Sequence, residues 1–149
     1  MCFAGSKVID SFSGDYAFLS NFYPAELEFG GFLFPTAEHA YQAAKSDDIN
    51  VWRRMQKLPF PGQAKKMGRN IKTVKDWDKI KINVMRKVLN NKFRDNPDLL
   101  KMLWDTGDAL LIEGNTWGDR FWGMCNGHGL NHLGKLLMEI RDDPMRSFM

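Results

Sequence analysis

Residues 35–45 read Pro35-Thr36-Ala37-Glu38-His39-Ala40-Tyr41-Gln42-Ala43-Ala44-Lys45. Pro35 interrupts the preceding segment and Thr36 is a preferred N-cap residue, so a helix is expected to begin here. Alanine, which fills much of the stretch, is the strongest helix former among the amino acids. We therefore predict a helix that carries the chain through to Lys45.

Glu38, Gln42 and Lys45 would share one face of this helix, because they are four and three residues apart. A carboxylate and an amine two turns apart are separated by roughly 10 Å along the axis, which is room for a substrate between them. The alternative is an ordinary solvated surface, the usual place for charged residues on a helix. Two features favour a functional face: the polar groups are confined to one stripe, and Glu38 lies in the first turn, where the helix dipole favours a carboxylate.

The composition is that of a soluble globular protein, with 44% hydrophobic and 26% charged residues in a chain of 149. This length predicts a single domain over residues 1–149. A net charge of +3 is compatible with an anionic substrate but is too small to indicate nucleic acid. With only Cys2 and Cys125, no signal-peptide pattern and no apolar stretch long enough to span a membrane, we expect a cytoplasmic protein.

The first thirty-five residues, which precede the Glu38 helix, are expected to form β structure. Residues 25–29 alternate apolar and polar side chains, and Gly30-Gly31 joins them to 32–34 as a hairpin. Helices are expected afterwards: one after a cap at Asp47 or Asp48, a short turn over 63–67, and a long helix capped by Asp76.

Two more helices complete the pattern. Asn96-Pro97 opens one, and the last runs from about Asn131 to Arg141 with Leu133, Leu136, Leu137 and Ile140 as its buried stripe. Residues 109–113 resemble a short buried strand. Two or three strands and five or six helices without βαβ alternation predict a compact, mainly helical α+β domain with a small β-sheet.

Residues 113–134 form a second informative region, rich in glycine and followed directly by a helix. Such loops can offer backbone N–H groups to an anion, and Gly123 lies in the middle of this one. Glu113 and Asp119 supply carboxylates, while Trp117 and Trp122 offer flat surfaces for a base or a sugar. The alternative is that the glycines turn the chain and the tryptophans pack. The spacing matches neither the Rossmann fingerprint nor the P-loop.

Two other groups could bind ligands. Cys125, His128 and His132 have the spacing of half a zinc site, but no paired cysteine motif completes it, so we expect no metal. Lys65, Lys66 and Arg69 form a compact basic group around Gly68, which is either a solvated face or a phosphate site.

Several blocks of the chain resemble the YbiA-like family, also called NADAR. They appear in family order and cover nearly the whole sequence: residues 18–24, 35–45, 64–69, 76–77, 111–113, 119–123 and 131–138. Asn21, in the first block, is added to the candidates for substrate binding.

The resemblance implies a YbiA-like α+β fold and an N-glycosidase that works without a cofactor. It places the site among Glu38, Lys45, Trp77, Asp119 and Trp122, with the lysine attacking the sugar. Family members act on phosphoribosylamino-pyrimidine intermediates of riboflavin synthesis or remove ADP-ribose from guanine in DNA. Either substrate is an expectation for this chain, and neither is favoured by the sequence.

The residues permit such a mechanism. Glu38 or Asp119 could stabilise the positive charge that develops on the anomeric carbon. Lys45 could form a Schiff base with an opened sugar if it is deprotonated. Trp77 and Trp122 would stack the base or sugar, and Lys65 and Arg69 would hold the phosphate. The competing class is a module that binds ADP-ribose or a nucleotide without cleaving it, which would need neither Glu38 nor Lys45.

Overall fold

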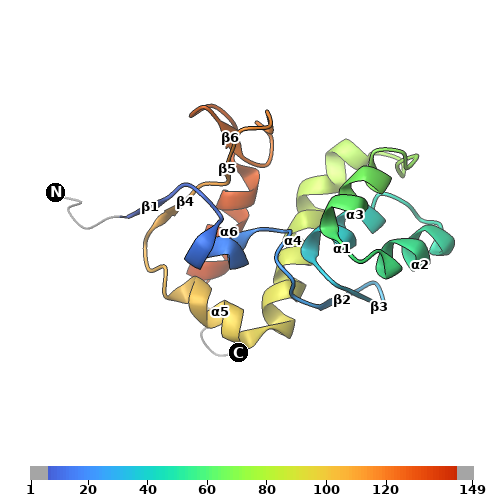
Figure 1. The fold of residues 1–149 in the computed structure, drawn as a ribbon, viewed down its shortest axis with the longest axis horizontal. Coiled ribbons are helices and arrows are strands. Elements are labelled where there is room, and N and C mark those ends of the chain that lie inside the picture. The colour runs from blue at the N-terminus through green and yellow to red at the C-terminus, as the bar shows by residue number, and fades with distance from the viewer. Residues whose placement is uncertain (1–6, 144–149) are drawn as a thin grey trace. The chain divides into compact units, whose positions relative to one another are not determined.

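The computed structural model describes residues 7–143 and divides into two compact units (Figure 1). The central unit is Asn21–Pro97, and the terminal unit comprises residues 7–20 and 98–143. Helices hold most of the regular structure within the described residues, and the strands are only two or three residues long. This confirms the α+β class dominated by helix.

The central unit opens with the predicted hairpin. Strand β2 (Leu27–Phe29) pairs antiparallel with β3 (Phe32–Phe34), and Leu27 lies opposite Phe34. Gly30 and Gly31 form the turn with φ of 60° and 85°, a left-handed conformation that favours glycine.

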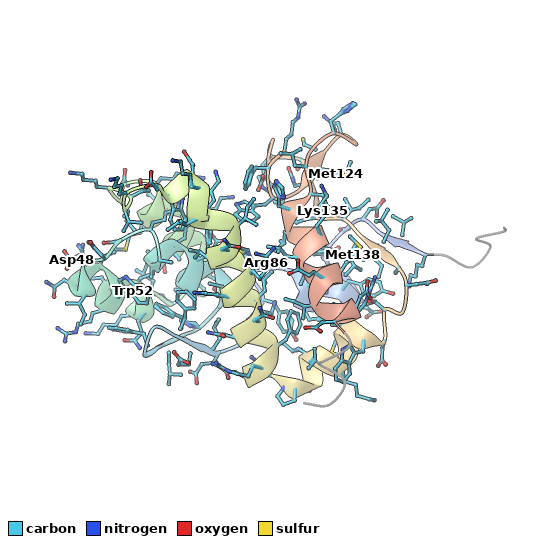
Figure 2. All side chains as sticks on the ribbon, turned by 180° about the vertical axis from the view of Figure 1, so that it is seen from behind. Asp48, Trp52, Arg86, Met124, Lys135 and Met138 are labelled. Carbon is cyan, nitrogen blue, oxygen red and sulfur yellow. The ribbon has the colours of Figure 1, made fainter. Side chains whose placement is uncertain are left out.

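Trp52 of α2 (Ile49–Lys57) fixes this hairpin to the rest of the central unit. Its ring centroid lies 5.6–5.9 Å from those of Phe29, Phe32 and Phe34, and its indole N–H donates to the carbonyl of Ser46 over 2.7 Å. Asp48, labelled with Trp52 in Figure 2, caps α2 by accepting from the backbone N–H of Asn50. The predicted cap is therefore confirmed.

Helix α1 (Ala37–Ala43) is the centre of this unit, because α2, α3 (Pro61–Gly68), α4 (Trp77–Asp95) and β3 all pack against it (Figure 1). Helix α3 is longer than the turn predicted over 63–67, since Pro61 occupies its first turn, where a missing N–H costs nothing. The core around α1 consists of Leu27, Phe34, Ala37, Ala40, Ala43, Met55, Ala64 and Val88.

Helix α4 begins directly after Asp76, as predicted, but two of its features were not predicted. Asp76 occupies the N-cap position, but its φ is 60° and its side chain makes no capping bond. Near the start of the helix the apolar Ile80 is 38% exposed, whereas Lys92, near its end, is fully buried. Burial lowers the pKa of Lys92 to about 7. Apolar spacing could not predict a buried lysine, because lysine is almost never fully buried.

The β structure predicted for the start of the chain is wrong for part of the terminal unit. Residues 14–19, expected to be β structure, form the 3-10 helix η1 (Gly14–Leu19), with Phe18 and Leu19 buried. Strand β1 (Val8–Ile9) instead pairs in parallel with β4 (Leu110–Leu111), which lies within the strand predicted over 109–113.

Helices α5 (Pro97–Trp104) and α6 (His132–Asp142) complete the terminal unit, together with the parallel pair β5 (Gly114–Asn115) and β6 (Met124–Cys125). All four apolar residues predicted for the α6 stripe are buried. The structure thus has more strands than expected and three two-stranded sheets within residues 7–143, rather than one small sheet. Two-residue strands leave no alternating pattern in a sequence, which explains the undercount.

Candidate active site

The polar residues of α1 are buried. All seven residues of the helix are buried, and Glu38 and Gln42 are only 8% and 5% exposed. The alternative of an ordinary solvated surface is therefore wrong for this helix. A carboxylate seldom becomes buried without a specific partner or task.

The start of α1 is held by side chains from its own first turn. Thr36 accepts the backbone N–H of His39, and its hydroxyl lies 2.7 Å from His39 Nδ1. The other ring nitrogen of His39 lies 2.8 Å from the carbonyl oxygen of Leu58. Burial lowers the pKa of His39, and the bond to Leu58 partly opposes this.

Hydrogen bonds to Asn21 and Gln42 help to position Glu38. Its backbone N–H donates to the carbonyl of Asn21 over 3.0 Å, which places Asn21 against the first turn of α1. Its Oε2 accepts a hydrogen bond of 2.6 Å from Nε2 of Gln42, one turn further along the helix. The Asn21 side chain donates to the sulfur of Met85 on α4.

Lys45 lies just beyond the helix, not on it. Helix α1 ends at Ala43, and the Lys45 N–H donates to the carbonyl of Gln42 in a turn. The Lys45 carbonyl accepts from the N–H of Val74 over 2.8 Å, so a long-range bond takes over where the helix would otherwise continue. The predicted spacing of Glu38 and Lys45 along one helix is wrong in this respect.

Glu38 and Lys45 nevertheless affect each other electrostatically. Burial lowers the pKa of Lys45, and the charge of Glu38 opposes this effect. The charges of Lys81 and Arg69 lower the same pKa further. A half-buried lysine beside other cations has the environment that increases its fraction of reactive, neutral amine.

Lys81 acts electrostatically on Lys45, and the sequence interpretation did not include it among the candidate residues. Its side chain is 22% exposed and pairs with Asp78 at 3.1 Å. It follows Trp77 by four residues on α4, so the two side chains share a face of that helix. This spacing was readable in the sequence, but only the packing of α4 against α1 relates it to Lys45.

Trp77 is 8% exposed and packs its indole against Tyr41, with ring centroids 5.4 Å apart at 51°. The expectation that it stacks a base or sugar stays a prediction. Arg69 directly follows α3 and Lys65 lies one turn earlier, so the basic group predicted for a phosphate sits at the C-terminal end of this helix.

The second set of predicted residues belongs to the terminal unit. Asn115 links two of these residues, Glu113 and Asp119. Its side-chain amide donates to Oε2 of Glu113 at 3.1 Å and to the backbone carbonyl of Asp119 at 2.8 Å. Oδ1 of Asp119 accepts the backbone N–H groups of Phe121 and Trp122 at 3.1 and 2.9 Å. Asp119 therefore shapes the loop that carries Trp122.

Gly123 is required for space. A Cβ at this position would lie 1.7 Å from Oε2 of Glu113 and 2.1 Å from its carbonyl oxygen. Trp122 is half-buried, and its ring meets that of Phe121 edge-on, with centroids 4.9 Å apart.

The structure thus gathers the predicted residues in two groups. The central unit holds Asn21, Glu38, Lys45, Lys65, Arg69 and Trp77, and the terminal unit holds Glu113, Asp119, Trp122 and Gly123. A cavity of about 540 Å³ in the central unit includes none of them; it is lined by Ser46, Asp47, Asp48, Val51, Arg54, Met67, Asn70, Ile71 and Lys72.

The residues considered for zinc have other contacts. Cys125 and His128 pair through their backbones, and the His132 ring packs on Phe121 with centroids 4.6 Å apart. No three His, Cys, Asp or Glu side chains within residues 7–143 are grouped as a metal would need. Cys2, the other cysteine considered, lies outside the described residues. In the same range, no helix has the length and apolar character to cross a membrane.

Comparison with known proteins gives consistent results. The chain is 39% identical to the N-glycosidase YbiA of Shigella flexneri over 135 residues, covering 89% of this chain and 84% of that protein. It is 37% identical to an N-glycosidase of Nostoc punctiforme over 134 residues, covering 86% of this chain and 85% of the relative.

A riboflavin biosynthesis protein of Vibrio vulnificus is 36% identical over 132 residues, which cover 87% of this chain. This chain spans only 36% of the length of that relative.

The NMR structure of the Escherichia coli protein YbiA matches with a TM-score of 0.83 at 33% identity. The match covers 96% of this chain and 88% of that one, which supports the predicted YbiA-like fold. The sequence profile of the NADAR domain matches residues 9–144, so the chain belongs to the NADAR domain family.

Proposed function

We propose that this chain is an N-glycosidase that hydrolyses the bond between a phosphorylated ribose and a base, with Lys45 as its nucleophile. The observation that carries the proposal is the half-buried amine of Lys45, close enough to the buried carboxylate of Glu38 to feel its charge. Burial lowers the pKa of this amine, although the charge of Glu38 opposes the effect. The N-glycosidase names of the relatives, at 37–39% identity over most of the chain, support the reaction type.

The reaction proceeds through an opened sugar. The ring C1–O bond breaks, the ring oxygen takes a proton, and an iminium ion joins C1 to the nitrogen of the base. The neutral amine of Lys45 adds to C1, and a proton passes from the lysine nitrogen to the nitrogen of the base. The base then leaves as a neutral amine, so a protonated Schiff base links the lysine to the sugar. Water then adds to C1, releasing the free amine and the open-chain aldehyde.

Glu38 is the main carboxylate in this proposal. Positive charge develops at C1 before the lysine adds, and an ionised carboxylate stabilises it. Asp119 remains the alternative, but its Oδ1 already accepts two backbone N–H groups that shape its own loop. The hydrogen bonds of Asp119 therefore favour Glu38 for the catalytic role.

The charge of residues 53–87, which lie within the central unit, supports a phosphorylated substrate. Residues 53–87 contain twelve Lys and Arg but only two acidic residues, Asp76 and Asp78. This local excess is far larger than the net charge of the whole chain indicates. Lys65 and Arg69 are proposed to bind the phosphate. The remaining proposed contacts are with Asn21, Trp77, Glu113, Trp122 and Gly123.

Two substrate classes fit this chemistry: the phosphoribosylamino-pyrimidine intermediates of riboflavin synthesis, and ADP-ribose attached to guanine in DNA.

We also propose that both units belong to one domain, because the family profile spans them. A cytoplasmic location is proposed with them. It agrees with the low cysteine count of the chain, which has only Cys2 and Cys125.

Mass spectrometry of the products tests the function. The protein is incubated with each substrate class in turn, and release of the free base identifies the one it cleaves. Binding of either substrate without release would instead favour the module that recognises a nucleotide without cleaving it, and would contradict the proposal.

A further inference from the structure

Gln42 occupies an unusual position for a glutamine. Its side chain is 5% exposed, and its Nε2 donates over 2.6 Å to Oε2 of Glu38, which is itself 8% exposed. Both residues lie on α1 one turn apart, so this short contact is between two largely desolvated groups. A charge-assisted hydrogen bond in such surroundings is strong and directional.

Gly68 confines the Gln42 amide from the other side. A Cβ on Gly68 would lie 1.8 Å from Oε1 of Gln42 and 2.5 Å from its Cδ. The φ of Gly68 is outside the left-handed region, so the backbone conformation does not require glycine there. The absence of a side chain at Gly68 therefore leaves the space that the Gln42 amide occupies in its place beside Glu38.

This arrangement leaves one atom unsatisfied. Oε1 of Gln42 is buried and has no hydrogen-bond partner among the described residues. A buried acceptor without a partner is unfavourable, and an apolar side chain of similar size would avoid that cost. The donor group of the same amide is the feature that an apolar side chain cannot replace.

A neutral donor also suits the neighbourhood of Lys45. An arginine or lysine in place of Gln42 would add a positive charge that neutralises Glu38. An amide orients the carboxylate and leaves its charge available for the cation that forms on the substrate.

We propose that Gln42 is a positioning residue, whose amide fixes the Glu38 carboxylate in one orientation beside Lys45. The inference rests on the proposed function for its catalytic consequence, but the contact itself can be tested without substrate. A donor that bonds the ionised form of a carboxylate lowers its pKa, so loss of the donor must raise it.

The test of the contact is a carboxyl titration by NMR. The chain has only five glutamates, so protein labelled with ¹³C at the glutamate side chain gives few signals, and Glu38→Gln assigns the one of interest. Gln42→Met removes the donor with little change in length. The Glu38 signal is expected to titrate at higher pH in Gln42→Met than in the wild type.

Gln56→Met is the matched control, because it makes the same chemical change on α2, where the amide donates to the carbonyl of Leu33. It should leave the Glu38 titration unchanged. If Gln42→Met does not fold, the contact can still be tested in the wild type by NMR. There the side-chain N–H signals of Gln42 must shift as Glu38 titrates. The proposal would be overturned if the Glu38 titration is unchanged in folded Gln42→Met. It would also be overturned if the Gln42 side-chain signals of the wild type do not shift as Glu38 titrates.

Kinetics test the role. Gln42→Met is expected to lower kcat by about tenfold or more with little change in KM. The rise of kcat/KM with pH is set by Lys45, and protonation of Glu38 adds a second, steeper fall at lower pH; Gln42→Met should move that second fall to higher pH. Unaltered kcat and pH profile would refute a positioning role. The two hypotheses can be refuted separately. If the enzyme is active but the Glu38 titration does not depend on Gln42, only the inference is refuted. If the titration depends on Gln42 but the protein cleaves neither substrate, the proposed function is refuted.

Discussion

The amine of Lys45 lies 5.8 Å from the centroid of the Tyr41 ring. A cation above an aromatic face is attracted to it, which favours the protonated amine. Burial acts in the opposite direction and is the largest influence on this group, since the pKa of Lys45 is lowered overall. The environment of Lys45 therefore increases the fraction of the neutral amine that a Schiff-base mechanism requires.

Lys45→Ala is expected to abolish turnover while leaving the fold and most of the ligand binding intact. Borohydride added during turnover should reduce the Schiff base and leave a covalent sugar adduct on the wild type, found on Lys45 by mass spectrometry. Lys57→Ala is the control, because Lys57 is exposed in the last turn of α2. Full activity in Lys45→Ala would refute the Schiff-base mechanism.

The pH dependence of the rate should respond to Lys81. Only the neutral amine attacks, so kcat/KM rises with pH through the pKa of Lys45, below the ordinary lysine range. The charge of Lys81 helps to lower that pKa. Lys81→Met removes it, so the rise should move to higher pH.

Lys79→Met is the matched control for this change. Lys79 is 81% exposed and pairs with Asp76, and it is not among the groups that shift the pKa of Lys45. Its pH profile should match that of the wild type. A rise that stays in place or moves to lower pH in Lys81→Met would show that Lys81 does not act on Lys45.

The start of α1 could be predicted from sequence, but its end could not. Thr36 marks the start through a bond to His39 three residues later, which is a local interaction. The end depends on the bond from Val74 to the carbonyl of Lys45. Ala44 and Lys45 are good helix formers, so nothing in their neighbourhood indicated that the helix stops before them.

For the candidate site, too, contacts between sequence neighbours could be predicted, whereas contacts between different helices could not. The sequence placed Glu38, Gln42 and Lys45 close together because they lie within eight residues. It did not indicate that Gly68 presses against Gln42 or that Lys81 bears on Lys45, because both relationships need α3 and α4 to be packed on α1. The pairing of β1 with β4 was likewise hidden, since about a hundred residues separate the two strands.

Gly123→Ala is expected to destabilise the fold. The added methyl group would overlap the carboxylate and the backbone of Glu113, and backbone atoms cannot move aside cheaply. Overpacking of this kind costs about 1–3 kcal/mol or more. Thermal or denaturant unfolding measures it.

Gly62→Ala is the control for Gly123→Ala. Nothing lies within 4 Å of a Cβ at Gly62, and this glycine is in α3, where alanine is the better helix former. It should leave the free energy of unfolding unchanged or raise it by up to about 1 kcal/mol. Equal stability of the two variants would mean that Gly123 is not closely packed against Glu113.

Removal of metal should leave the rate unchanged. Lysine and carboxylate chemistry supplies every step of the proposed reaction, and Cys125, His128 and His132 lack the partners that zinc sites use. Exhaustive chelation followed by an assay, with metal analysis of the purified protein, checks this. Stoichiometric zinc whose removal abolishes activity would contradict the prediction.

Trp122→Ala separates stacking from packing. If Trp122 stacks a base or sugar, its loss should weaken substrate binding by about 1–3 kcal/mol, the range for aromatic stacking on nucleobases. If it serves only to pack against Phe121, the protein should instead lose a few kcal/mol of stability, as large-to-small changes in a core do. The melting midpoint and the dissociation constant, measured on the same variant, distinguish the two.

The half-buried position of Trp122 favours the first outcome, because a ring that is not fully enclosed keeps part of its surface available to a ligand. Phe121→Ala is the informative comparison, since it removes the packing partner and leaves the Trp122 ring in place. We expect Phe121→Ala to lose more stability than affinity and Trp122→Ala to lose more affinity than stability. Unchanged affinity in Trp122→Ala would exclude Trp122 from the site and leave Asp119 with the structural role that its two backbone hydrogen bonds describe.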